Sequence, residues 1–221
     1  RSQAESNTMK WTVPNQLTVG RVGLSIVFFV LLALYQPGTA AARWLLNGAF
    51  VIFVIAGITD FLDGYLARKW NQVSVFGRIA DPFVDKLLIV GAFTMLAGSN
   101  FRLAAGASDE QLPAWLVGGM ATSIQAWMVV AVLAREFIVS AIRGYSESQG
   151  IQFSATSAGK IKMVVQLFAL GTVLFQLANL PDAMWAIWLK VVLVWLAVIV
   201  TVLSGLAYVH KAKDLLSGDM D

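Results

Sequence analysis

Residues 59–86 have the sequence TDFLDGYLARKWNQVSVFGRIADPFVDK, which contains four of the thirteen acidic residues of the chain. Asp60 and Asp63 are three positions apart, and Asp81 and Asp85 are four positions apart. On a helix, residues at these spacings share one face, so each pair directs its two carboxylates the same way. A short polar run between the pairs can turn the chain. We therefore predict two neighbouring helices with four carboxylates converging between them.

Four carboxylates in one small space repel one another, and like charges at contact distance do not all stay ionised without compensation. A divalent cation provides that compensation, and oxygen ligands favour Mg²⁺, Mn²⁺ or Ca²⁺ over zinc. The small residues Gly64, Ala67 and Gly77 leave room for a bulky ligand against the helices. Arg68 offers a planar guanidinium suited to phosphate. Together these residue types predict chemistry on a nucleotide or a diphosphate.

The complete spacing, Asp-x2-Asp-Gly-x2-Ala-Arg-x8-Gly-x3-Asp-x3-Asp, resembles the signature of the CDP-alcohol phosphatidyltransferase family, integral membrane enzymes of phospholipid synthesis. All eight positions of the signature are present, as Asp60, Asp63, Gly64, Ala67, Arg68, Gly77, Asp81 and Asp85. The alternative is two helix ends with solvated acids, which is ordinary for either pair alone. The acids adjoin long apolar runs, where stray charge is costly, and this favours a functional site.

The composition indicates a membrane protein. Of 221 residues, 58% are hydrophobic and 13% are charged, and the mean hydropathy is +0.72. Soluble domains carry about 25% charged residues. Six apolar runs approach the roughly 20 residues that cross a bilayer. They cover residues 17–35, 44 into the acidic stretch, 82–96, 114–142, 158–180 and 184–209.

We therefore predict an all-α integral membrane protein with six transmembrane helices and a short N-terminal interfacial segment around Trp11. Residues 9–213 form the expected membrane domain, residues 1–8 are expected to be an expression remnant or a disordered lead, and residues 214–221 a polar C-terminal tail. The Gly118–Gly119 pair inside the fourth run and Gly171 in the fifth are interpreted as sites of close helix packing. The absence of cysteine and the single histidine exclude a thiolate nucleophile and a His-rich metal site. We expect no nucleic-acid partner.

Loop charges predict the orientation of the bundle. With six spans, both termini share one side with the loops after the second and fourth spans. The opposite side carries only Arg43, Arg102 and Lys190, which leaves thirteen of the sixteen Lys and Arg residues on the side of the termini. Cytoplasmic loops are enriched in Lys and Arg. Both termini and the acidic stretch are therefore expected in the cytoplasm, most simply at a bacterial inner membrane.

A second polar stretch covers residues 134–166 and joins the fourth and fifth apolar runs. Its charged residues include Arg135, Glu136, Arg143, Lys160 and Lys162. The alternative to a binding role is positive-inside anchoring with apolar stems buried in the membrane, and for Lys162 both interpretations stay open. Arg135 has Glu136 and Ser140 beside it next to apolar residues. This arrangement predicts a cationic pocket for an anionic acceptor, on the same side as the carboxylates.

This second stretch resembles the branch of the family that makes phosphatidylglycerol phosphate, as do residues 14–18 with Arg21. The resemblance implies transfer of a phosphatidyl group from CDP-diacylglycerol to sn-glycerol 3-phosphate with release of CMP, by direct displacement at a metal-assisted site. Another acceptor alcohol, such as inositol phosphate, serine or phosphatidylglycerol, remains an alternative. The resemblance also implies a homodimer in the lipid bilayer.

Residue roles follow from the resemblance. The expected ligands of Mg²⁺ or Mn²⁺ are Asp60, Asp63, Asp81 and Asp85, and Asp85 is also the expected general base. The expected CDP-lipid contacts are Asp60, Asp63, Gly64, Ala67, Arg68, Gly77 and Arg78. The expected acceptor-phosphate contacts are Arg135, Arg143, Lys160 and Arg21. A cation transporter that uses the aspartates as an ion path is the alternative from another class, although no acid lies deep in the first, fourth, fifth or sixth run.

Overall fold

The computed structural model describes residues 13–70, 75–103, 107, 111–149 and 157–216. Within these ranges it describes only the backbone of residues 13–18, 60–70, 75–85, 147, 157–158, 160 and 214–216. These residues contain α-helices and one 3₁₀ turn, and no strand is found among them. The elements are α1 (Val13–Leu34), α2 (Ala42–Trp70), α3 (Val75–Leu96), η1 (Ser99–Phe101), α4 (Ala114–Val117), α5 (Ala126–Ser148), α6 (Ser157–Asn179) and α7 (Met184–Leu216). All except η1 and α4 have 22 residues or more.

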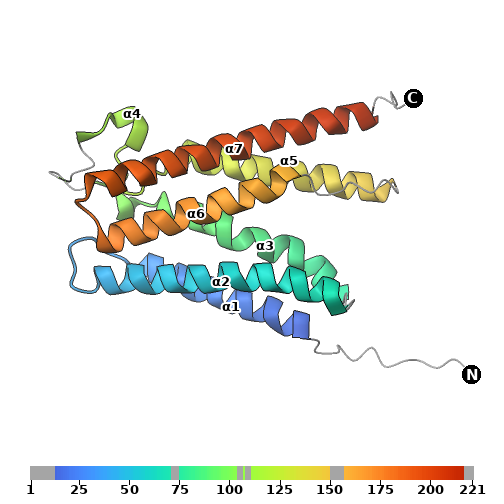
Figure 1. Cartoon of the computed structure of the whole chain (residues 1–221), viewed down its shortest axis with the longest axis horizontal. Helices are drawn as coiled ribbons and strands as arrows, with labels where there is room; N and C mark the ends of the chain where they lie inside the picture. Colours follow the sequence, from blue (N-terminus) through green and yellow to red (C-terminus); the bar gives the residue numbers. More distant parts are fainter. Residues whose placement is uncertain (1–12, 71–74, 104–106, 108–110, 150–156, 217–221) are drawn as a thin grey trace, which may run out of the picture.

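The six long helices run side by side along one axis of the molecule (Figure 1). α1 begins and α7 ends at the same end of the bundle, as an even number of crossings requires (Figure 1). At the opposite end, the Asn179 side-chain amide donates to Asn47 Oδ1 at 2.8 Å, which joins the end of α6 to the start of α2. α2 and α6 are therefore antiparallel neighbours.

The core is made of apolar side chains that project between the helices. Phe28 of α1, Phe53 of α2, Phe93 of α3, Leu170 of α6 and Val194 of α7 are each 2% exposed or less. Large apolar side chains also cover the outside of the helices. Such a surface is costly in water and suits a lipid environment, where backbone groups are satisfied within each helix.

Three helical segments are long and apolar enough to cross a membrane, namely Ala42–Thr59, Ile161–Asn179 and Met184–Lys213. Two shorter apolar helical segments, Val19–Leu34 and Lys86–Leu96, lie in α1 and α3. Both counts refer to the described part of the chain. An all-helical membrane protein is therefore supported, and six spans stay a prediction.

The prediction of one continuous run over residues 114–142 is wrong. α4 ends after a single turn, and Gly118 and Gly119 follow with φ angles of +63° and +68°. Glycine adopts this left-handed conformation without the penalty that a Cβ atom imposes. The interpretation of this pair as a helix-packing site is wrong for the same reason, because the two glycines turn the chain so that α5 begins only at Ala126.

Candidate functional site

The acid pairs lie on consecutive long helices, as predicted. α2 continues through positions 60 and 63 to Trp70, and α3 begins at Val75 and continues through positions 81 and 85. At spacings of three and four on continuous helices, each pair shares one helix face. The expected metal ligands and CDP-lipid contacts are Asp60, Asp63, Gly64, Ala67, Arg68, Gly77, Arg78, Asp81 and Asp85. Their side chains lie outside the part of the chain that the structure describes. The convergence of the four carboxylates stays a prediction.

The helix that carries the first acid pair packs closely on α6. A Cβ atom added to Gly57 would lie 3.3 Å from Leu167 Cδ2, so the two helices approach each other at this level. Gly57 precedes Asp60 by about one helical turn. Because α2 and α6 are antiparallel, the start of α6, which bears Lys160 and Lys162, lies toward the same end of the bundle as the acid-bearing part of α2 (Figure 1).

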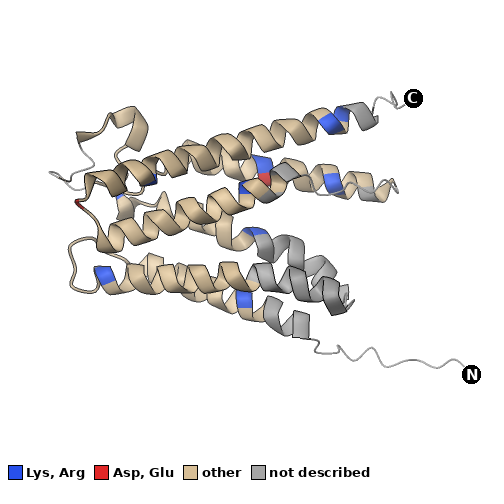
Figure 2. Cartoon of the chain, in the orientation of Figure 1, with Lys and Arg blue, Asp and Glu red and all other residues tan. Residues whose placement is uncertain are grey.

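A cluster of charged and polar side chains lies where α3, α5, α6 and α7 meet, and we call it the cationic cluster. Its members are Lys86, Arg135, Glu136, Arg143, Lys162, Ser204 and Tyr208. Most of the described Lys and Arg residues lie in the half of the bundle that holds the start of α1 and the end of α7 (Figure 2). The chain therefore gathers positive charge at the end where the acid-bearing helices meet.

Glu136 is the centre of the cluster. Its Oε1 atom accepts from Arg135 Nη1 at 3.1 Å and from the Lys162 ammonium group of α6. All three side chains are buried, with at most 10% of each exposed. A carboxylate that is buried with two cations stabilises both, and its removal would leave them uncompensated.

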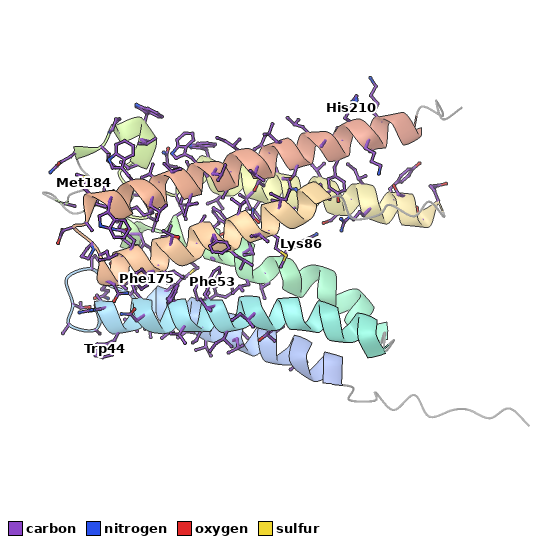
Figure 3. The ribbon with its side chains drawn as sticks, in the orientation of Figure 1. Trp44, Phe53, Lys86, Phe175, Met184 and His210 are labelled. Carbon is purple, nitrogen blue, oxygen red and sulfur yellow. The ribbon has the colours of Figure 1, made fainter. Side chains whose placement is uncertain are left out.

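Lys86 connects the cluster to the acid-bearing helix. Its ammonium group donates to Ser140 Oγ on α5, and Ser140 Oγ donates to the Glu136 backbone carbonyl at 2.6 Å. Lys86 directly follows Asp85 in the sequence. It lies on the side of α3 that faces α5 (Figure 3). The cationic cluster therefore begins one residue after the last of the four acids.

Two of the four expected acceptor contacts are brought together. Arg135 and Arg143 both lie within 5.6 Å of the Tyr208 ring, measured from Cζ to the ring centroid. Arg21 is 4% exposed on α1, which packs against the acid-bearing helices α2 and α3. The side chain of Lys160 lies outside the described residues.

Sequence reasoning missed Lys86, Ser204 and Tyr208 as members of this site. Lys86 was counted only as a loop charge, although it adjoins the signature. Ser204 and Tyr208 had a detectable signal, because with Thr201 they form a polar row at spacings of three and four in an otherwise apolar helix. The side chains of Thr201, Ser204 and Tyr208 are each at most 3% exposed.

No group of three or more His, Cys, Asp or Glu side chains able to hold a metal ion occurs among the side chains that the structure describes. The positions that the signature offers, 60, 63, 81 and 85, supply only carboxylate oxygens on two consecutive helices. Oxygen donors of this kind fit a hard divalent cation such as Mg²⁺ or Mn²⁺. The donor set is therefore compatible with the expected ion.

An apolar groove of about 630 Å³ lies between α2, α6 and the start of α7. Phe53 and Phe175, on α2 and α6, are among its lining residues (Figure 3). At one end the groove reaches Gly57 and Ile58, and at the other it reaches Trp185. The groove therefore ends within one helical turn of Asp60.

Residues 11–203 match the family model of the CDP-alcohol phosphatidyltransferases. The chain, an α-helical membrane protein with the complete acidic signature, belongs to this family of transferases.

Relatives that share almost the full length carry the name CDP-diacylglycerol–glycerol-3-phosphate 3-phosphatidyltransferase. The protein from Bacillus subtilis (strain 168) is 31% identical, over 93% of this chain and 97% of its own length. The protein from Haemophilus influenzae (strain Rd) is 33% identical, over 94% of this chain and 97% of its own. The protein from Shigella flexneri serotype 5b is 33% identical, over 94% of this chain and 99% of its own.

Proposed function

We propose that the protein transfers a phosphatidyl group from CDP-diacylglycerol to sn-glycerol 3-phosphate, forming phosphatidylglycerol phosphate and CMP. The observation that carries this proposal is the cationic cluster beside the acid-bearing end of α3. The names of the relatives support the same pair of substrates.

The charge of the cluster selects an anionic acceptor. Its described side chains comprise four cations, Lys86, Arg135, Arg143 and Lys162, against one carboxylate, Glu136, which is a net charge of +3. Partly buried positive charge of this size is stabilised by an anion that binds with hydrogen bonds. Arginine forks match phosphate oxygens in pairs. The phosphate group of sn-glycerol 3-phosphate supplies such an anion, whereas serine is a zwitterion without net charge.

Asp60, Asp63 and Asp81 would hold a Mg²⁺ or Mn²⁺ ion, with Asp85 at its edge. When bound, the ion would neutralise negative charge on the diphosphate and on the departing CMP. Gly64, Ala67 and Gly77 would make room for the cytidine, while Arg68 and Arg78 would bind the diphosphate. Four of these five contacts are carried over from the signature, and the fifth, Arg78, directly follows Gly77.

Asp85 would act as the base. Its carboxylate takes the proton of the acceptor hydroxyl group, and the hydroxyl oxygen attacks the phosphorus that carries diacylglycerol. The bond between that phosphorus and the CMP oxygen breaks, so CMP leaves with the electron pair. Lys86, the next residue, belongs to the cationic cluster, and this supports a base close to the acceptor.

The positive charge near the chain ends supports an orientation with both termini and the active site in the cytoplasm (Figure 2). The relatives are proteins of bacteria, which supports the bacterial inner (plasma) membrane as its location. We also propose a homodimer, on the family resemblance alone.

A panel of acceptors tests the proposed function. Purified protein in lipid–detergent micelles with CDP-diacylglycerol and Mg²⁺ or Mn²⁺ is expected to release CMP only with glycerol 3-phosphate. Inositol phosphate, serine and phosphatidylglycerol are the other arms of the panel. Turnover with one of these in place of glycerol 3-phosphate would contradict the acceptor assignment. Cation flux in proteoliposomes without CMP release would favour the transporter alternative.

The apolar groove is proposed to hold one acyl chain of CDP-diacylglycerol, and a leucine at Gly171 is expected to obstruct it. A Cβ atom at Gly171 would lie 3.8 Å from Phe50, an ordinary contact, so the remaining atoms of the leucine would extend into the groove. A displaced acyl chain stays in the hydrocarbon of the micelle, so only its packing contacts with the groove are lost, and the KM for CDP-diacylglycerol is expected to rise roughly 2- to 5-fold.

The matched control is Gly23→Leu, because a Cβ atom at Gly23 in α1 meets nothing within 4 Å. Steady-state kinetics with varied CDP-diacylglycerol measures both variants. An unchanged KM in Gly171→Leu, or an equal rise in the control, would contradict the acyl-chain assignment.

A further inference from the structure

We propose that Tyr208 of α7 is a positioning residue that holds the two guanidinium groups of Arg135 and Arg143 in place for the phosphate of the acceptor. This inference rests on the proposed function, because it assigns a role within the same acceptor site. Tyr208 itself does not contact the acceptor and acts on it only through the two arginines.

Tyr208 is held rigidly inside the bundle. It is 1% exposed and is among the largest fully buried side chains that the structure describes. Its hydroxyl oxygen accepts a hydrogen bond from Arg143 Nη2 at 2.8 Å. A buried tyrosine with its hydroxyl group engaged has little freedom to move, so it provides a fixed reference for the arginine that it contacts.

One aromatic ring serves both arginines. Arg135 Cζ lies 5.6 Å from the Tyr208 ring centroid, and Arg143 Cζ lies 5.5 Å from it. Both distances fall within the roughly 6 Å range of cation–π attraction. Two guanidinium groups repel each other, and attraction to a common ring offsets part of that repulsion and fixes their separation. Two arginines at a fixed separation are what recognition of a tetrahedral phosphate requires.

The remainder of α7 is shaped to receive Arg135. Ser204 Oγ accepts from Arg135 Nε at 3.1 Å. A Cβ atom at Gly205 would lie 2.9 Å from Arg135 Cγ, so the helix approaches the arginine stem closely at a residue without a side chain. Ser204, Gly205 and Tyr208 occupy one face of α7. This face therefore constrains Arg135 at its stem, at its Nε atom and at its guanidinium plane.

Arg143 retains a donor for the ligand. Its Nε atom is buried and has no hydrogen-bond partner among the described residues, while its Nη2 atom is engaged by Tyr208. Buried donors in native structures are normally satisfied, and one that is not indicates a missing partner. An oxygen of the acceptor phosphate would supply it. The Tyr208 hydroxyl group would then determine where Arg143 presents this donor.

The test is Tyr208→Phe, which keeps the ring and removes only the hydroxyl group. We expect the KM for glycerol 3-phosphate to rise about tenfold, since a hydrogen bond to a charged group is lost. The KM for CDP-diacylglycerol is expected to stay within about twofold of wild type. The thermal midpoint is expected to stay within a few degrees of wild type. Tyr145→Phe is the matched control, because Tyr145 is 54% exposed on α5.

A double-mutant cycle separates positioning from general stabilisation. In the Arg143→Ala background, Tyr208→Phe is expected to cause no further rise in the KM for glycerol 3-phosphate, because the hydroxyl group acts through Arg143. An unchanged KM in Tyr208→Phe, equal rises in both KM values, or additive effects in the cycle would overturn the inference. If wild-type protein does not turn over glycerol 3-phosphate at all, the proposed function has failed, which is a distinguishable result.

Discussion

Replacing Asp85 with asparagine is expected to lower the turnover number by about 10²–10⁴-fold, the usual contribution of a general base. Asparagine has nearly the same shape as aspartate but cannot take the proton of the acceptor hydroxyl group. Binding of CDP-diacylglycerol is expected to persist, because Asp60, Asp63 and Asp81 remain. CMP release at saturating substrates measures the first effect, and protection of the thermal midpoint by CDP-diacylglycerol measures the second.

Asp182→Asn is the matched control for this experiment. Asp182 lies in the exposed turn between α6 and α7, at the end of the bundle opposite the acid pairs (Figure 1). Its replacement is expected to leave turnover unchanged. Activity of Asp85→Asn within tenfold of wild type would remove Asp85 as the base. Loss of lipid binding together with activity would instead assign it a ligand role.

Replacing Arg135 with alanine is expected to raise the KM for glycerol 3-phosphate by about 10- to 150-fold, since hydrogen bonds to charged groups contribute about 1.5–3 kcal/mol. The KM for CDP-diacylglycerol is expected to change much less. Arg135 is buried in the cationic cluster and is oriented by Glu136 and Ser204. Its loss leaves Glu136 paired with Lys162, so the carboxylate is not left alone.

Two further variants make this prediction specific. Arg135→Lys keeps the charge but loses the planar fork, and is expected to give an intermediate KM. Arg43→Ala removes an arginine at the opposite end of the bundle, whose Nη2 atom contacts Asn179 Oδ1 at 3.4 Å, and is expected to leave both KM values unchanged. Equal rises in both KM values for Arg135→Ala would contradict the assignment of an acceptor site.

The order of the helices could be predicted from the chain because it depends on local properties. The fifth predicted run, residues 158–180, nearly coincides with α6, and the sixth begins at Met184 as α7 does. Run length reflects the transfer of apolar side chains out of water, which adds residue by residue along the chain. The fourth run shows the limit of this approach, because its hydropathy conceals the turn at Gly118 and Gly119.

The candidate site was predicted in part for the same reason. The spacing of the acids follows from helical periodicity, so the chain alone indicates that each pair shares a face. The sequence also shows Glu136 next to Arg135, but their contact was found only in the structure. The contacts that complete the cluster span much greater separations. Arg143 and Tyr208 are 65 positions apart, and Lys86 and Ser140 are 54 positions apart.

By itself, the amino-acid sequence determined the family, the membrane character and the two sets of charged residues on which the chemistry depends. The tertiary structure alone decided that one tyrosine of the last helix lies against both arginines of the fifth. The physical reason is that periodicity specifies which residues share a face of one helix. The rotation and the crossing of neighbouring helices are decided by how all their side chains pack together, and no single stretch of sequence contains that information.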